Sequence, residues 1–129
     1  MNAGDATVFV VDDDYSVRRS LKRLLESAAF KVEAFSSADD FLSYRRRDVP
    51  SCLVLDVRMP GFGGLALQRQ LVEAGSEIPI IFITAYADGE VEARVREAGA
   101  AAFLVKPLDD EVLLGAVREA LGIIKEETP

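Results

Sequence analysis

Four apolar segments of strand length recur along the chain, and each of them ends at a polar residue. They cover residues 8–11, 52–55, 80–83 and 101–105. Strands that are buried on both faces of a parallel sheet have continuous apolar sequences of this kind. A further segment, residues 31–35, alternates polar and apolar side chains, as an edge strand does. The sequence therefore predicts five strands, with residues 31–35 at an edge of the sheet.

Segments with helical periodicity alternate with these strands. Asp88 and Asp109 are candidate N-caps, and Gly75 and Gly99 are candidate C-terminal stops. Ser37, with Asp40 three residues later, resembles a capping box and predicts a helix that runs to about Arg46. The apolar positions of the other helices are Val17, Leu21, Leu24, Leu25 and Ala28 over about residues 15–28; Leu65, Leu67, Leu71 and Val72; Val91, Val95 and Ala98; and Val112, Leu113, Ala116, Val117, Ala120 and Leu121.

Strands that alternate with helices predict an α/β fold, with a parallel sheet, right-handed crossovers and helices on both faces. Five such units fit the doubly wound, flavodoxin-like strand order 2-1-3-4-5. In that order the first and third strands are neighbours where the winding reverses, and their carboxyl ends flank a crevice. We expect Asp12, Asp13 and Asp56 to converge there, with Thr84 and Lys106 arriving from the fourth and fifth strands.

Length and composition narrow the range of functions. The 129 residues fit one domain, and a net charge of −7 argues against nucleic-acid binding by this chain alone. The single cysteine, Cys52, lies in a predicted strand as a small buried hydrophobe, excludes a disulfide within the chain and favours a reduced, cytoplasmic setting. No signal peptide is evident, and no apolar run approaches the roughly 20 residues that span a bilayer. We expect one domain over residues 1–124, followed by a polar tail or linker start at 125–129.

The chain contains no histidine, which removes histidine triads, histidine-metal sites and histidine general bases. Three carboxylates at one sheet edge repel each other and require a cation, and a donor set without His or Cys favours Mg²⁺. Lys106 supplies a compact charge suited to a phosphoryl oxygen, and Thr84 supplies a hydroxyl donor. Taken alone, Asp56 is most simply a turn residue. The combination of four strand ends indicates instead a nucleophile for phosphoryl transfer.

The chain resembles, over essentially its full length, the receiver domain of two-component response regulators. The amino-acid sequence around Asp56, together with Phe103 and Lys106-Pro107-Leu108, is most similar to the FixJ-like group. The segments that carry the resemblance are Val10-Val11-Asp12-Asp13-Asp14, Leu55-Asp56-Val57-Arg58-Met59-Pro60 followed by Gly64, Ile83-Thr84-Ala85, and Val105-Lys106-Pro107.

The resemblance implies a phosphoacceptor, which is Asp56, that takes a phosphoryl group from the phosphohistidine of a sensor histidine kinase. It implies that Asp13, Asp56 and the carbonyl of Arg58 hold Mg²⁺, with Asp12 acting mainly through water. Thr84 would contact the phosphoryl oxygens, as would Lys106. The protein would support its own phosphorylation and autodephosphorylation without being an enzyme for a separate substrate. Arg58 and Tyr86 occupy positions that the family leaves variable, and both are bulky enough to slow or steer attack by water.

The resemblance also implies an output route, in which Thr84 moves toward the phosphoryl group and Phe103 turns inward. The face of the fourth helix and fifth strand, to which we assign Val91, Arg94 and Val95 with Phe103, would then control a homodimer or an attached output domain. Members of the FixJ-like group usually carry a DNA-binding domain after the receiver, so DNA would be reached only through a domain outside this chain. No membrane association is expected.

Three other classes of protein share part of this sequence pattern. A haloacid-dehalogenase-type phosphatase needs a second Asp two residues after its nucleophile, where this chain has Arg58. A pseudo-receiver typically lacks an acid, the threonine or the lysine, all of which are present. A flavodoxin needs a phosphate-cradling loop after the first strand, where the acids at 12–14 would repel a phosphate unless a metal intervenes.

Overall fold

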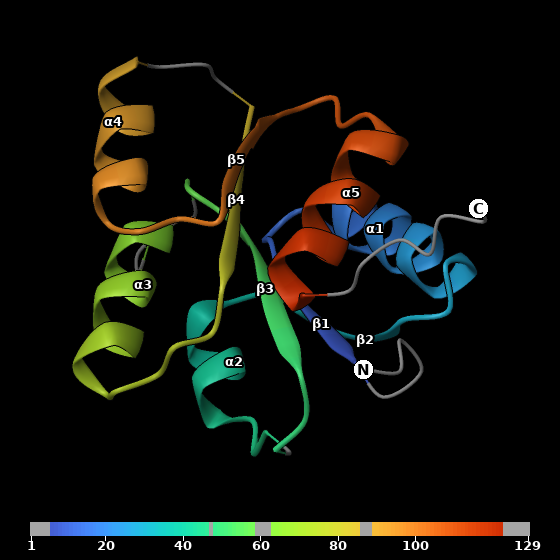
Figure 1. Ribbon diagram of the computed structural model, residues 1–129, viewed down its shortest axis with the longest axis horizontal. Coiled ribbons are helices and arrows are strands. Elements are labelled where there is room, and N and C mark those ends of the chain that lie inside the picture. The colour runs from blue at the N-terminus through green and yellow to red at the C-terminus, as the bar shows by residue number, and fades with distance from the viewer. Residues whose placement is uncertain (1–5, 47, 59–62, 86–88, 123–129) are drawn as a thin grey trace.

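The computed structural model describes residues 6–46, 48–58, 63–85 and 89–122, in which strands and helices alternate along the chain (Figure 1). The elements are β1 (Thr7–Val11), α1 (Tyr15–Ser27), β2 (Lys31–Phe35), α2 (Ala38–Ser43), β3 (Ser51–Asp56), α3 (Gly64–Glu73), β4 (Ile80–Thr84), α4 (Gly89–Glu97), β5 (Ala102–Val105) and α5 (Asp110–Leu121).

The five strands form one parallel sheet in the order β2-β1-β3-β4-β5. Figure 1 shows α1 and α5 on one face of this sheet and α2, α3 and α4 on the other. The predicted flavodoxin-like fold is confirmed, including β2 as an edge strand. Among the described residues, no helix is both long and apolar enough to cross a membrane.

Successive side chains of the central strands enter two separate cores, as the period of two in a strand requires. On β3, Cys52 and Val54 face α1 and α5, whereas Leu53 and Leu55 face the other three helices. All four side chains are fully buried. Burial on both faces explains why these strands are continuous apolar runs, and it raises the pKa of the Cys52 thiol to about 12. The prediction that Cys52 is a small buried residue is therefore confirmed.

The prediction that the second helix reaches Arg46 is wrong, because α2 ends at Ser43. The next residue, Tyr44, adopts an extended backbone, and its ring packs edge-on against Phe35 with centroids 5.3 Å apart. Arg45 and Arg46 consequently lie beyond the helix, on the surface. Arg47 lies outside the described residues.

Helix caps agree with the predictions at Ser37 and Asp109, whose side chains accept hydrogen bonds from backbone amides at 3.1 Å in both cases. Asp14 is a cap that the sequence analysis missed, because it was interpreted only as part of an acidic run. Its carboxylate accepts from the amide of Ser16 at 2.8 Å and so fixes the start of α1. The candidate cap Asp88 lies outside the described residues.

Candidate functional site

Four strands deliver polar side chains to the carboxyl edge of the sheet. Asp56 is the last residue of β3 and Thr84 the last of β4, while Asp12 and Lys106 directly follow β1 and β5. One oxygen each from Asp12, Asp13 and Asp56 lies within 4.8 Å of the others, a spacing at which they could hold one metal ion. The predicted convergence is therefore observed, and the chain has an acidic cluster formed entirely of oxygen donors.

Lys106 bridges two members of this cluster. Its Nζ lies 3.0 Å from Asp12 Oδ2 and 3.3 Å from Asp56 Oδ2. The Asp12 side chain is fully buried and that of Lys106 is only 20% exposed, so this is a largely desolvated contact. The peptide bond between Lys106 and Pro107 is cis. One ammonium group thus neutralises only part of a cluster of three carboxylates.

Burial and the neighbouring groups together shift the pKa of the Asp56 carboxyl group. Burial raises the pKa of its carboxyl group, and repulsion by Asp12 adds to the rise, while the backbone amide of Arg58 and the charge of Lys106 oppose it. Burial also acts to lower the pKa of Lys106, but hydrogen bonding and attraction by Asp12 and Asp56 outweigh burial and raise it. The site therefore favours an additional cation, and its oxygen donors suit Mg²⁺.

The backbone after Asp56 is shaped to present this carboxylate. The amide of Arg58 donates to Asp56 Oδ1 at 3.0 Å, and the amide of Gly64 donates to the Val57 carbonyl at 3.1 Å. A Cβ on Gly64 would lie 3.0 Å from Val57 Cα and closer still to the carbonyl oxygen of Asp56. Gly64 is therefore required for the close approach of α3 to the end of β3. The intervening residues 59–62 lie outside the described part of the chain.

The sequence analysis did not identify two groups that hold Asp12. The amide of Asp14 donates to Asp12 Oδ1 at 2.9 Å, and Nη1 of Arg18 donates to the Asp12 main-chain carbonyl at 2.8 Å. Arg18 is one of several charged residues that lie between the apolar positions of α1. Nothing in the sequence distinguishes it from its neighbour Arg19, because the contact depends on how the β1–α1 turn folds.

The predicted switch residues lie on adjacent strands. Thr84 is fully buried at the end of β4, and Phe103 on β5 is buried opposite Phe82. The expectation that Val95 contributes to the exposed face of α4 and β5 is wrong, because Val95 is fully buried in the core. The exposed part of that face includes Arg94 and the half-buried Val91. Tyr86 lies outside the described residues.

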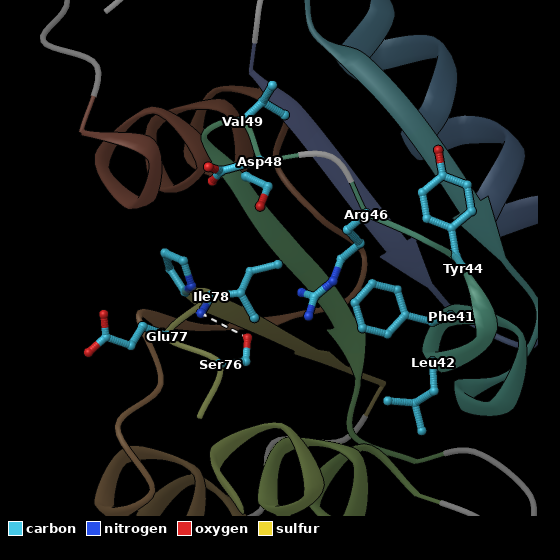
Figure 2. Close-up of a pocket in the computed structure, with 11 residues that line it drawn as sticks. Phe41, Leu42, Tyr44, Arg46, Asp48, Val49, Ser76, Glu77 and Ile78 are labelled. Atoms are coloured by element: carbon cyan, nitrogen blue, oxygen red, sulfur yellow. Dashed lines mark hydrogen bonds between the residues drawn. The ribbon is translucent and has the colours of Figure 1, made fainter. Parts of the chain in front are cut away.

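A pocket of about 750 Å³ lies at the opposite edge of the sheet, at the amino ends of β3 and β4 (Figure 2). Its polar side chains include Arg46, Asp48 and Glu77, all of which are exposed to solvent. The guanidinium of Arg46 lies over the ring of Phe41 at 5.3 Å. None of the predicted site residues lines this pocket.

The doubly wound parallel sheet carries an acidic cluster at the carboxyl ends of β1 and β3, with the ammonium of Lys106 beside it. The sequence profile described as "Response regulator receiver domain" matches residues 8–118. This chain belongs to that family, and it is a receiver domain of the kind found in two-component response regulators.

Known proteins support the same assignment. The chain is 43% identical to the response regulator protein TodT of Pseudomonas putida over 95% of its own length and 54% of the relative. It is 50% identical to Nodulation protein W of Bradyrhizobium diazoefficiens over 87% of its length and 49% of that relative. The solved structure of FixJ-N superimposes with a TM-score of 0.84 at 35% identity, covering 95% of this chain and 98% of that one. The chain therefore spans about half the length of the curated relatives it matches.

Proposed function

We propose that Asp56 accepts a phosphoryl group from the phosphohistidine of a sensor histidine kinase. The observation that carries this proposal is the buried carboxylate at the end of β3, bridged to Asp12 by the ammonium of Lys106. A carboxylate that is held beside a lysine and a second acid is suited to attack phosphorus once a metal ion offsets the repulsion.

The transfer follows from the groups around Asp56. An oxygen of its carboxylate attacks the phosphorus atom, the P–N bond breaks, and the bonding electron pair leaves with the imidazole nitrogen of the donor. The product is an acyl phosphate whose oxygens lie within reach of Lys106 and of the Thr84 hydroxyl. Water attack on the same phosphorus reverses the modification, so the domain acts as a switch without a separate substrate. Arg58 is placed by the proposal at the entrance for that water.

The acidic cluster fits Mg²⁺ in donor type and spacing. Asp13, Asp56 and the main-chain carbonyl of Arg58 would hold the ion, and Asp12 would act mainly through water. When bound, Mg²⁺ neutralises charge on the carboxylates and on a phosphoryl oxygen. The fully buried Asp12 and the exposed Asp13 flank the position where such an ion would sit.

The output proposed for the domain runs from Thr84 to Phe103. Movement of the Thr84 hydroxyl toward a phosphoryl group leaves space beside β4, and inward rotation of Phe103 fills it. The change remodels the surface of α4 and β5, which would form a homodimer or hold an output domain. Relatives of this chain are named response regulator proteins and transcriptional regulatory proteins, so DNA would be reached through a domain beyond this chain. The boundary between a receiver at 1–124 and a tail at 125–129, and a cytoplasmic location, stay predictions.

The phosphoacceptor is tested by incubating the protein with a small phosphodonor and Mg²⁺ and mapping the adduct by mass spectrometry. We expect one phosphoryl group on Asp56, and no labelling of Asp56→Asn. The exposed Asp48→Asn variant, at the other edge of the sheet, is the matched control and should label normally. Labelling of Asp12, Asp13 or a hydroxyl would contradict the proposal, and complete absence of labelling would favour a pseudo-receiver.

The output surface is tested by sedimentation of the wild type and of Val91→Asp with and without a phosphoryl mimic. We expect the mimic to produce a dimer in the wild type and not in the variant. An unchanged mass would instead indicate an intramolecular or heterologous output. If NMR shifts on adding the mimic also spare residues 84–105, the proposed route through Thr84 and Phe103 is wrong.

A further inference from the structure

Asp12 is held at both its side chain and its main chain. Its carboxylate accepts from the amide of Asp14 and from Lys106, and its main-chain carbonyl accepts from Nη1 of Arg18 at 2.8 Å. Its own amide donates to the Phe35 carbonyl at 3.2 Å. These contacts fix Asp12 at the buried end of the acidic cluster. They therefore also constrain the backbone of the next residue, Asp13.

Arg18 reaches this carbonyl because the β1–α1 turn is closed in a defined way. Asp14 caps α1 through the amides of Ser16 and Val17, which places Arg18 one turn into the helix. The Arg18 side chain is half-buried, and its guanidinium lies 5.7 Å from the centroid of the Tyr15 ring, a cation–π arrangement that restricts its orientation. The guanidinium thus links the first turn of the helix to the residue that ends β1.

We propose that Arg18 is a positioning residue, which fixes the β1–α1 turn through the Asp12 carbonyl and so sets the affinity of the acidic cluster for a divalent cation. This inference rests on the proposed Mg²⁺ site, but it assigns to Arg18 no contact with the metal or with the phosphoryl group. Partners that orient metal ligands in this indirect way typically change metal affinity by about tenfold or more when they are removed.

The charge of Arg18 acts in the opposite direction to its hydrogen bond. A guanidinium near three carboxylates repels an incoming cation, so loss of the charge alone would tighten Mg²⁺ binding. The neighbouring Arg19 is exposed on the same helix. Its replacement therefore measures the effect of losing one positive charge, which solvent and salt keep small. Comparison of Arg18→Met with Arg19→Met therefore separates positioning from charge, since both variants lose one positive charge.

Two measurements on the full chain test the proposal. The first is the rate of hydrogen exchange at the Asp14 amide, measured by NMR in metal-free protein. The Arg58 amide, which follows β3 in the same site, serves as the internal reference. We expect exchange at Asp14 to become several-fold faster in Arg18→Met and to stay unchanged in Arg19→Met. The second is an Mg²⁺ titration, in which Arg18→Met binds about tenfold more weakly and Arg19→Met stays within about twofold of the wild type.

The conservative variant Arg18→Lys keeps the charge and can offer one donor, so we expect it to recover part of both effects. If Arg18→Met exchanges and binds like Arg19→Met, or binds Mg²⁺ more tightly, the proposal is overturned. If Arg18→Met fails to fold, the same comparison is made between Arg18→Lys and Arg19→Lys, and equal behaviour of these two overturns it. A wild type that does not bind Mg²⁺ would refute the proposed metal site, while the exchange measurement would still decide whether Arg18 orders the turn.

Discussion

At the carboxyl ends of the strands, Asp12 and Asp56 are buried against Lys106. At the amino ends, by contrast, Arg46, Asp48 and Glu77 line an open pocket and are exposed to solvent. The first edge holds three like charges within 4.8 Å of each other, and the second holds charges of both signs in contact with solvent. Interaction energies between charges rise as water is excluded. Burial of like charges, rather than the presence of a pocket, distinguishes the edge at which we propose that phosphoryl transfer occurs.

This difference has a structural origin in the loops. At the carboxyl edge, each predicted site residue lies within two positions of a strand end, so the sheet itself fixes its place. At the amino edge, most of the residues that line the pocket belong to segments that connect elements, namely Tyr44, Arg46, Asp48, Val49 and Ser76 to Pro79. Residues attached to a rigid sheet can hold like charges close together. We therefore expect substitutions at the carboxyl edge to change the free energy of unfolding more than substitutions at the amino edge.

The largest effect is expected for Lys106→Met, which leaves two buried carboxylates without their ammonium partner. We expect a loss of about 3 kcal/mol in the free energy of unfolding, measured by chemical denaturation near neutral pH. The exposed Lys31→Met, at the amino end of β2, is the control and should change stability by no more than about 0.5 kcal/mol. Equal effects of the two substitutions would remove the contrast between the edges.

The pH dependence of this first effect has a definite sign. The pKa of Lys106 is raised above its ordinary value of 10.5 in the folded protein. Its stabilisation is therefore fully present below pH 10.5 and is lost as the pH rises through the folded-state pKa. The difference between wild type and Lys106→Met should therefore shrink in that alkaline range.

The next effect is expected for Gly64→Ala, because the added methyl group meets the backbone of Asp56 and Val57, which cannot move independently of β3. We expect a destabilisation of about 2 kcal/mol and a displaced Asp56 carboxylate. Gly115 lies in the interior of α5 with open space around its Cβ position, so Gly115→Ala should stabilise the protein by about 0.5–1 kcal/mol. A Gly64→Ala protein as stable as the wild type would show that the close approach is unnecessary.

Asp56→Asn should stabilise the metal-free protein by on the order of 1 kcal/mol, because it removes a carboxylate that is buried beside Asp12. Since the folded-state pKa of Asp56 is raised above 3.8, protonation relieves the same penalty. The advantage of the variant should therefore fall as the pH decreases through that raised pKa toward 3.8. Millimolar Mg²⁺ should reverse the order of stability, and a variant that is less stable than the wild type without Mg²⁺ would contradict this account.

The smallest effect is expected at the amino edge, for Arg46→Met. This substitution removes an exposed cation–π contact with Phe41 and should cost about 0.5 kcal/mol, with no change in the response to Mg²⁺. The same denaturation series, with and without the ion, measures both quantities. A change in the Mg²⁺ response would mean that the two edges are coupled through the sheet.

The sheet order and the acidic cluster could be predicted from sequence because each depends on local pattern: apolar runs of strand length with polar residues at their ends. The end of α2 could not, because it depends on the tertiary packing of Tyr44 against Phe35. The contact of Arg18 with the Asp12 carbonyl likewise depends on the path of a turn. The burial of Val95 was missed because α4 is largely polar, and only its position against β5 shows which of its apolar residues enters the core.

The central claim is that the cation and the phosphoryl group bind at the carboxyl edge of the sheet, and not in the pocket at its amino edge. An NMR titration of the full chain with Mg²⁺ and then with beryllofluoride, a phosphoryl mimic, tests it most directly. We predict that the amide shifts concentrate at residues 12–14, 56–58, 84 and 106, while those lining the pocket of Figure 2 stay unchanged. Shifts that centre on residues 44–51 and 76–79, or no response to either addition, would contradict the account.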